Sequence, residues 1–190
     1  MKILIKLKNV YDNENIILSD EKGIFRVLEH RVDHSAKNLQ QAQLNYYFSR
    51  TGVCRKQLLI KLKNESVCVN PGQLMFMCGD IDIKTNVKGM GDLINKAISS
   101  SITGEATIKP KYYGTGYVML EHTNKYILLE QTDNENGIVI SDATFLACSG
   151  NVKIKSIPVS TISSAALGKE GVFNLLLKGD GIVAFTSTVP

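Results

Sequence analysis

The sequence predicts a mainly β protein made of one β unit that occurs twice, with an insertion in the first copy. Residues 66–85 align without a gap with residues 137–156, at an offset of 71 positions. Further on, a glutamate followed nine residues later by a Gly-x-Gly tripeptide also occurs twice, at an offset of 65 positions. The first copy therefore carries six extra residues between its two matching blocks.

The aligned positions of the two copies share their chemistry, and their alternation of apolar and polar residues is typical of β-strands. The matched pairs are Val67 with Ile138, Val69 with Ile140, Leu74 with Phe145, Gly79 with Gly150, Asp80 with Asn151, Ile81 with Val152, Ile83 with Ile154 and Lys84 with Lys155.

Length and composition indicate a folded globular chain. The 190 residues suit one domain or two small fused halves, and 44% of them are hydrophobic against 21% charged. The net charge of +4 permits an acidic partner without requiring one. No apolar run approaches the roughly 18 residues that cross a bilayer, and lysines interrupt the first eight residues. We therefore expect a cytoplasmic protein with no membrane association.

Residues 1–43 have no counterpart in the repeat, so we expect an N-terminal extension that docks on the edge of the first unit. The first β repeat is predicted over residues 44–121 and the second over residues 122–190. The extension is predicted to hold strands at 1–8, 16–18 and 23–28, and a helix or connecting loop at 32–43.

Within the first repeat, the pattern predicts strands and one inserted helix. Residues 74–77 are apolar on both faces, which predicts a central strand. The helix is expected near residues 92–101, with Asp92 in its first turn and an apolar stripe after it. Other strands are predicted at 44–49, 57–63, 67–69, 81–84, 106–109 and 117–120, and in the second repeat at 126–130, 137–140, 172–177 and 182–185.

Glycines and one proline mark the predicted turns. Proline presets φ and glycine accepts positive φ, so the Asn-Pro-Gly at 70–72 predicts a turn. The Gly-x-Gly tripeptides at 114–116 and 179–181 predict tight hairpins rather than a dinucleotide loop, because no third glycine or helix follows. The predicted turn residues are Pro71, Gly72, Gly79, Gly114, Gly116, Gly150, Gly179 and Gly181.

The sequence carries no catalytic constellation, and we expect no cofactor and no metal. His30 and His34 stand four residues apart, a spacing that could hold a metal on a helix, but no third ligand is placed beside them. The four cysteines fit neither a metal knuckle nor a redox pair by their spacing, and we expect them reduced and mostly buried. They are Cys54, Cys68, Cys78 and Cys148.

The turns and core positions from residue 44 to the C-terminus resemble the altered-inheritance-of-mitochondria family. The resemblance rests on the segments at 69–72, 75–81, 104–105, 114–116, 145–147, 168–173 and 177–181. It implies an uncharacterised bacterial branch, and fungal members that support the organisation of the mitochondrial inner membrane. It also implies a duplicated β-sandwich or double-stranded β-helix-like fold, similar to two fused subunits of the tryptophan RNA-binding attenuator protein. Trimers with a pseudo-sixfold ring are expected, and no catalytic residue is implied.

Two function classes follow, with a third as a remote alternative. The leading hypothesis is a non-enzymatic binding or scaffold protein that forms a homotrimer; a monomer is the alternative if residues 1–43 cover the free sheet edge. The second hypothesis is RNA binding by lysines on alternate strand positions and by tyrosines that stack on bases. The third is a small cupin-like enzyme, which would need clustered histidines. The candidate RNA-contacting residues are Lys61, Lys63, Lys84, Tyr112, Tyr113, Tyr117, Lys153 and Lys155.

Overall fold

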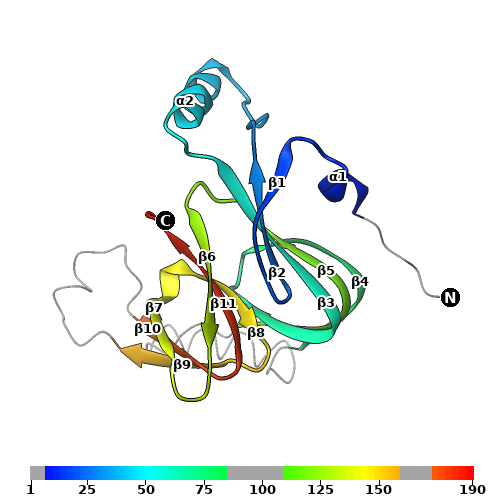
Figure 1. The fold of residues 1–190 in the computed structure, drawn as a ribbon, viewed down its shortest axis with the longest axis vertical. Coiled ribbons are helices and arrows are strands. Elements are labelled where there is room, and N and C mark those ends of the chain that lie inside the picture. The colour runs from blue at the N-terminus through cyan, green and yellow to red at the C-terminus, as the bar shows by residue number, and fades with distance from the viewer. Residues whose placement is uncertain (1–6, 85–108, 159–172) are drawn as a thin grey trace, which may run out of the picture.

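The computed structural model describes residues 7–84, 109–158 and 173–190 (Figure 1). Within these residues the chain is mainly β, as predicted, and its strands form an eight-stranded sheet and a three-stranded sheet. In chain order the elements are α1 (Lys8–Tyr11), β1 (Ile16–Lys22), β2 (Phe25–His30), α2 (Leu39–Arg50), β3 (Arg55–Val69), β4 (Leu74–Lys84), β5 (Lys111–Leu120), β6 (Tyr126–Thr132), β7 (Ile138–Ser141), η1 (Asp142–Thr144), β8 (Phe145–Ser149), β9 (Lys153–Pro158), β10 (Phe173–Lys178) and β11 (Gly181–Ser187).

Strand β3 is the centre of the large sheet. One of its edges pairs with β2 and then with β8, and its other edge pairs with β5. The sheet continues from β8 through β11 to β6, while β4 pairs with the far edge of β5. It curls until β6 approaches β1, where the Lys22 ammonium donates a hydrogen bond to the Leu129 carbonyl oxygen at 2.9 Å. The result is a nearly closed, barrel-like sheet.

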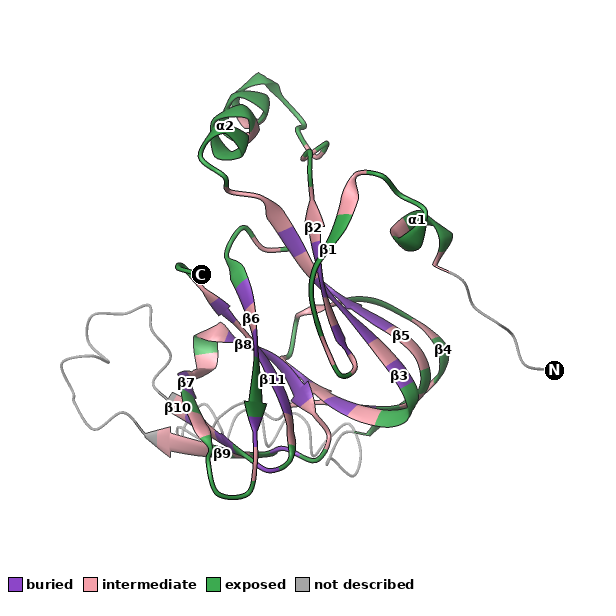
Figure 2. Ribbon diagram, in the orientation of Figure 1, coloured by how far each residue is buried: buried purple, intermediate pink, exposed green. Residues whose placement is uncertain are grey.

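The main core lies inside this curled sheet. Leu58, Ile60 and Leu62 alternate along β3 and are at most 1% exposed. They pack with Phe25 of β2 and Leu120 of β5 in one cluster, and the buried positions follow β3 and β5 in Figure 2. Burying each such side chain contributes roughly 1.5–3 kcal/mol, so the period-2 pattern of β3 contributes substantially to the fold's stability.

A second core cluster joins the two sheets. It contains Phe145 and Cys148 of β8 together with Leu175 and Leu177 of β10. The small sheet has the order β7-β10-β9, so its middle strand turns its apolar side toward β8.

Two predictions for the N-terminal part are wrong. Lys8 begins helix α1, although residues 1–8 were expected to be a strand; the rest of that predicted strand lies outside the described residues. Residues 44–49 belong to helix α2 and not to a strand. The Asn38 side chain caps α2 by accepting a hydrogen bond from the Gln41 amide at 2.8 Å, and glutamine, alanine and leucine in its first turns favour helix. These local preferences outweigh the β propensity of the aromatic residues that follow.

The strands predicted at 57–63 and 67–69 are one continuous strand. A register shift between Lys63 and Glu65 replaces the expected break. Asn64 sits at this shift with φ of 60°, a conformation that asparagine adopts more readily than most residues.

Gly79, Gly114 and Gly116 do not form the predicted turns, because β4 and β5 run straight through them. Gly79 lies opposite Gly116 in the β4–β5 pair. A Cβ on Gly79 would lie 2.5 Å from the Thr115 carbonyl oxygen, and one on Gly116 would lie 2.2 Å from the Cys78 carbonyl oxygen. These glycines therefore serve a close approach of two backbones, which is the other common role of glycine in a strand.

The other predicted turn residues lie between strands, except Gly181, which begins β11. Pro71 and Gly72 separate β3 from β4, and Gly150 follows β8. The tripeptide at 179–181 joins β10 of the small sheet to β11 of the large one, so the hairpin predicted there is wrong.

The sequence repeat is matched by a repeat in strand pairing. Two residues that lie opposite each other on paired strands of the first copy have equivalents that also lie opposite each other in the second copy. The equivalent pairs are Leu74–Leu120 and Phe145–Phe185, Met77–Val118 and Cys148–Val183, Ile83–Tyr112 and Ile154–Leu177, and Lys84–Lys111 and Lys155–Leu176. The copies differ because β4 and β5 stay in one sheet, whereas the second copy divides between both sheets. Two separate, equivalent sandwiches are therefore not confirmed. The helix expected near residues 92–101 lies outside the described residues, as do residues 106–108 of the strand expected at 106–109.

Candidate functional site

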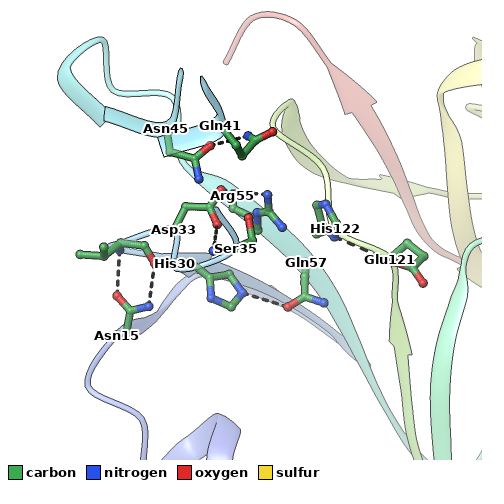
Figure 3. A network of polar contacts seen from close by, with 11 residues as sticks. Asn15, His30, Asp33, Ser35, Gln41, Asn45, Arg55, Gln57, Glu121 and His122 are labelled. Atoms are coloured by element: carbon green, nitrogen blue, oxygen red, sulfur yellow. Dashed lines mark hydrogen bonds and ion pairs between the residues drawn. The ribbon is translucent and has the colours of Figure 1, made fainter. Parts of the chain in front are cut away.

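A polar network lies where the ends of β2 and β3 meet α2 (Figure 3). The Arg55 guanidinium forms an ion pair with the Asp33 carboxylate at 2.8 Å. The Ser35 amide donates a hydrogen bond to the same carboxylate at 2.9 Å, and His30 contacts Gln57 at 2.9 Å. Burial raises the pKa of Asp33, but the hydrogen bonds from Ser35 and the charge of Arg55 outweigh it, so that the pKa lies below its ordinary value.

The cavity beside this network is too small for an organic ligand. Its volume is about 20 Å³, which is room for roughly one water molecule. Residues of α2 and of the β2 and β3 ends line it, including Asn45, Phe48 and Val53. The ion pair and the hydrogen bonds join the end of β2 and the segment after it to the first residues of β3, beside α2.

The histidines do not gather into a metal site. His30 is engaged with Gln57, and His122 lies 3.9 Å from Glu121. Over residues 7–84, 109–158 and 173–190, no group of three or more histidine, cysteine or acidic side chains is placed to hold a metal ion. The spacing of His30 and His34 therefore has no third ligand among these residues.

Six of the eight candidate RNA-contacting residues lie on the paired strands β3, β4 and β5, namely Lys61, Lys63, Lys84, Tyr112, Tyr113 and Tyr117. Tyr112 is 5% exposed and belongs to the main core, so its ring is not available for stacking. The Tyr117 ring packs against Tyr11 with 6.4 Å between centroids. Lys61 lies over Tyr117 and Lys84 lies over Tyr113, at 5.9 and 5.6 Å from the ring centroids. The remaining candidates are Lys63 on β3 and Lys153 and Lys155 on β9, and RNA binding stays a prediction.

A buried lysine connects the two copies of the repeat. The Lys109 ammonium, only 6% exposed, forms an ion pair with Asp142 of η1. It also donates a hydrogen bond to the Asn70 side chain at 2.7 Å and lies 5.2 Å from the Phe145 ring centroid. Its charge is thus paired and hydrogen-bonded, as a buried cation requires.

The two copies also join directly through their backbones, at a contact between β3 and β8. We call this contact the internal joint. Val67, Cys68 and Val69 lie opposite Ser149, Cys148 and Ala147. The Gly150 amide donates to the Ser66 carbonyl oxygen at 2.8 Å, and the Asn70 amide donates to the Leu146 carbonyl oxygen at 2.8 Å.

Strands β4 and β7 are two of the edge strands among the described residues. In the part of the chain that the structure describes, β4 pairs with β5 alone and β7 pairs with β10 alone. The prediction that residues 74–77 form a central strand is therefore wrong. Both strands expose apolar side chains: Met75 is 52% exposed, Met77 37% and Val139 54%. Period-2 analysis could not find these edges, because a strand that is apolar on both faces has the same pattern at an edge as in the centre.

The comparisons with known proteins identify the family. A family model described as Mitochondrial biogenesis AIM24 matches residues 49–189. The chain belongs to this family. The match confirms the resemblance inferred from the turns and core positions, and it begins within α2, so that residues 1–48 lie outside it.

A solved structure with a similar fold is among those that match the chain. It is a protein from Streptococcus pyogenes solved by a structural-genomics consortium, with a TM-score of 0.52 and 19% sequence identity. The match covers 71% of this chain and 60% of that one, so the chain spans less than two thirds of that protein's length. No curated protein matches the chain. None of the helices among the described residues is long and apolar enough to span a membrane.

Proposed function

We propose that this family member is a cytoplasmic, non-enzymatic protein that assembles with copies of itself into a ring and acts as a scaffold or binding surface. One observation carries the proposal. The internal joint has two sides, β3 and β8, and the chain contains a second copy of each side, on strands β7 and β4. All four cysteines are free thiols, which fits a reducing compartment.

The offset of 71 residues defines the proposed joint between protomers. It carries Cys68 of β3 onto Val139 of β7, and Cys148 of β8 onto Met77 of β4. Because Cys68 lies opposite Cys148 in the internal joint, Val139 of one protomer is expected opposite Met77 of the partner subunit. Strand β7 of each protomer would then extend the sheet of the next at β4.

The surroundings of β7 support this placement. On its paired side, β3 places Val67 opposite Tyr112 of β5. The corresponding pair in the second copy is Ile138 opposite Leu177 of β10. Strand β7 thus pairs with β10 as the end of β3 pairs with β5. Among the described residues, no strand pairs with the other edge of β7 in the way that β8 pairs with β3.

The exposed side chains support burial of both edges. Met77 and Val139, the two residues that the offset brings together, are 37% and 54% exposed. Open, apolar strand edges associate unless the protein protects them. The hairpin of β1 and β2 pairs with β3 and with neither of these edges. The described part of the extension, residues 7–43, therefore pairs with neither edge of the proposed joint, which favours assembly over the monomer.

The contact is heterologous, because β7 of one protomer meets a different strand of the next. A heterologous contact either closes into a ring or grows into a filament. The family resemblance favours closure at three chains, and the internal joint would alternate with the joint between protomers around such a ring.

Light scattering of the purified chain tests the proposal. We expect a mass three times the 20.9 kDa of one chain. Met77→Asp and Val139→Asp should each lower the mass, because each places a charge in the joint. Leu18→Asp is the matched control, since Leu18 is 49% exposed on another edge strand, β1, outside the joint. A monomeric parent protein, or equal masses for all variants, would contradict the proposal.

A further inference from the structure

We propose that Cys68 and Cys148 form a reversible disulfide that locks the two copies of the repeat together, with a peroxide as the oxidant and a small thiol as the reductant. The sequence gives no sign of this pair, because 80 residues separate the two cysteines. Strand pairing brings them together at the internal joint.

The geometry of the joint suits a disulfide. Cys68 and Cys148 are opposite residues of antiparallel strands. The Cα atoms of such pairs lie about 4.5–5.5 Å apart, which falls inside the range of roughly 4.4–6.8 Å that disulfides span. The two side chains are close enough for each to change the pKa of the other. Strand pairing therefore places the two Cα atoms at a separation that a disulfide can span.

The two thiols differ in a way that assigns their roles. The hydrogen bond with Cys148 lowers the pKa of Cys68 to about 7, against the opposing effect of burial, and the nearby Lys111 ammonium lowers it further. The Lys111 residue lies opposite Cys68 on the other side of β3. Cys148 is 0% exposed, and its hydrogen bond to Cys68 and its burial raise its pKa well above the ordinary value. Cys68 is thus the attacking thiolate and Cys148 the resolving thiol.

The reaction balances with one peroxide molecule. The Cys68 thiolate attacks one oxygen of hydrogen peroxide, the O–O bond breaks, and the leaving hydroxide takes up a proton to form water. The Cys148 sulfur then attacks the sulfur of the Cys68 sulfenic acid. The S–O bond breaks, the proton of Cys148 leaves with the hydroxide as a second water, and the S–S bond forms. Two electrons pass from the two thiols to the peroxide, and two equivalents of a small thiol reverse the change by exchange.

The consequence is a covalent tie between β3 of the first copy and β8 of the second. A disulfide that closes a loop of this length restricts the unfolded chain strongly, and we expect Tm to rise by on the order of 10 °C. Neither of the other two cysteines shares this setting. Burial raises the pKa of Cys54 and of Cys78, which makes both thiols less reactive.

The test treats the reduced full-length chain with hydrogen peroxide and measures its intact mass, its free thiols and its Tm. We expect a loss of two hydrogens in mass, two fewer titratable thiols, and a cross-linked peptide that joins Cys68 to Cys148. A reducing agent should reverse all three changes and the rise in Tm.

Cysteine variants distinguish the Cys68–Cys148 disulfide from oxidation at the other cysteines. Cys68→Ala and Cys148→Ala should each abolish the internal cross-link, while the double variant Cys54→Ser with Cys78→Ser should keep it. Because Cys148 is in the core and its variant could unfold, the peptide map of the unmodified protein stands as an independent measurement. Cross-links between chains, cross-links through Cys54 or Cys78, or oxidation of Cys68 to sulfinic acid without a disulfide would overturn the proposal.

Discussion

Gly79 of β4 lies directly opposite Gly116 of β5, and neither position has room for a side chain. Gly79 also has φ of +120°, which L side chains rarely adopt. The close approach lets both strands run through this point within one sheet.

Gly79→Ala should destabilise the fold by about 3 kcal/mol or more, because the added Cβ meets backbone atoms and the backbone is strained. Gly52→Ala is the control: Gly52 also has a positive φ, but nothing lies within 4 Å of its Cβ position. The control should lose about 1 kcal/mol. Urea unfolding of both variants compares the free energies, and equal losses would contradict the role assigned to the close approach.

Lys109→Met should lower the free energy of unfolding by about 1–3 kcal/mol, because Asp142 and Asn70 lose the partner that satisfies them. Adding Asp142→Leu should restore part of that loss, since no unpaired carboxylate then remains. Lys153→Met changes an exposed lysine and should have little effect. Thermal unfolding of these proteins and of the single variant Asp142→Leu checks this, and additive effects in the double variant would contradict the coupling.

Acid should weaken the ion pair between Asp33 and Arg55. Its pKa in the folded protein lies below the ordinary value of 3.8, so the carboxylate stabilises the fold above that value. The stabilisation is lost as the pH falls through the lower, folded pKa. Asp33→Asn should therefore be less stable than the unmodified protein at pH 7, and the difference should shrink below about pH 4. Urea unfolding across this range measures it, and a constant difference would argue against the Arg55–Asp33 pair.

Alkylation of the native, reduced protein should report the thiolate of Cys68. Its rate should rise with pH around a midpoint of about 7, because the pKa of this thiol is lowered to that value. Cys148 should not react until the protein unfolds, since it is fully buried. Iodoacetamide labelling with peptide mass spectrometry measures both rates, and a Cys68 midpoint near the ordinary value of 9.0 would contradict the electrostatic account.

The sequence predicted the β class and the repeat because both depend on residue patterns. The alternation of Leu58, Ile60 and Leu62 sets one buried face of β3 in any sheet that contains it. The offset of 71 residues relates opposite pairs in the two copies, such as Met77–Val118 and Cys148–Val183. Register follows from the pattern because a shift of one residue would reverse the faces of a strand.

The features missed by the sequence depend on which segments become neighbours. A Gly-x-Gly tripeptide has the same letters in a turn as at a close backbone approach, so Gly116 was assigned to a hairpin. The pairing of Cys68 with Cys148 arises from the joint between distant strands, which spacing does not encode. The open edge at Met77 likewise depends on what pairs beyond β4. Which segments become neighbours is decided by the tertiary structure. The candidate functional features, the cysteine pair and the open edge of β4, depend on it.

The central claim is that β7 of one protomer joins β4 of the next in the register of the internal joint. The direct test is a double variant, Val139→Cys with Met77→Cys, made in a chain with Cys78→Ser to remove the adjacent thiol. Mild oxidation should cross-link protomers into dimers and then into a closed ring, and a mixture of the two single variants should give dimers only. A cross-link within one chain, or no cross-link between chains at concentrations where the ring is expected, would contradict the account.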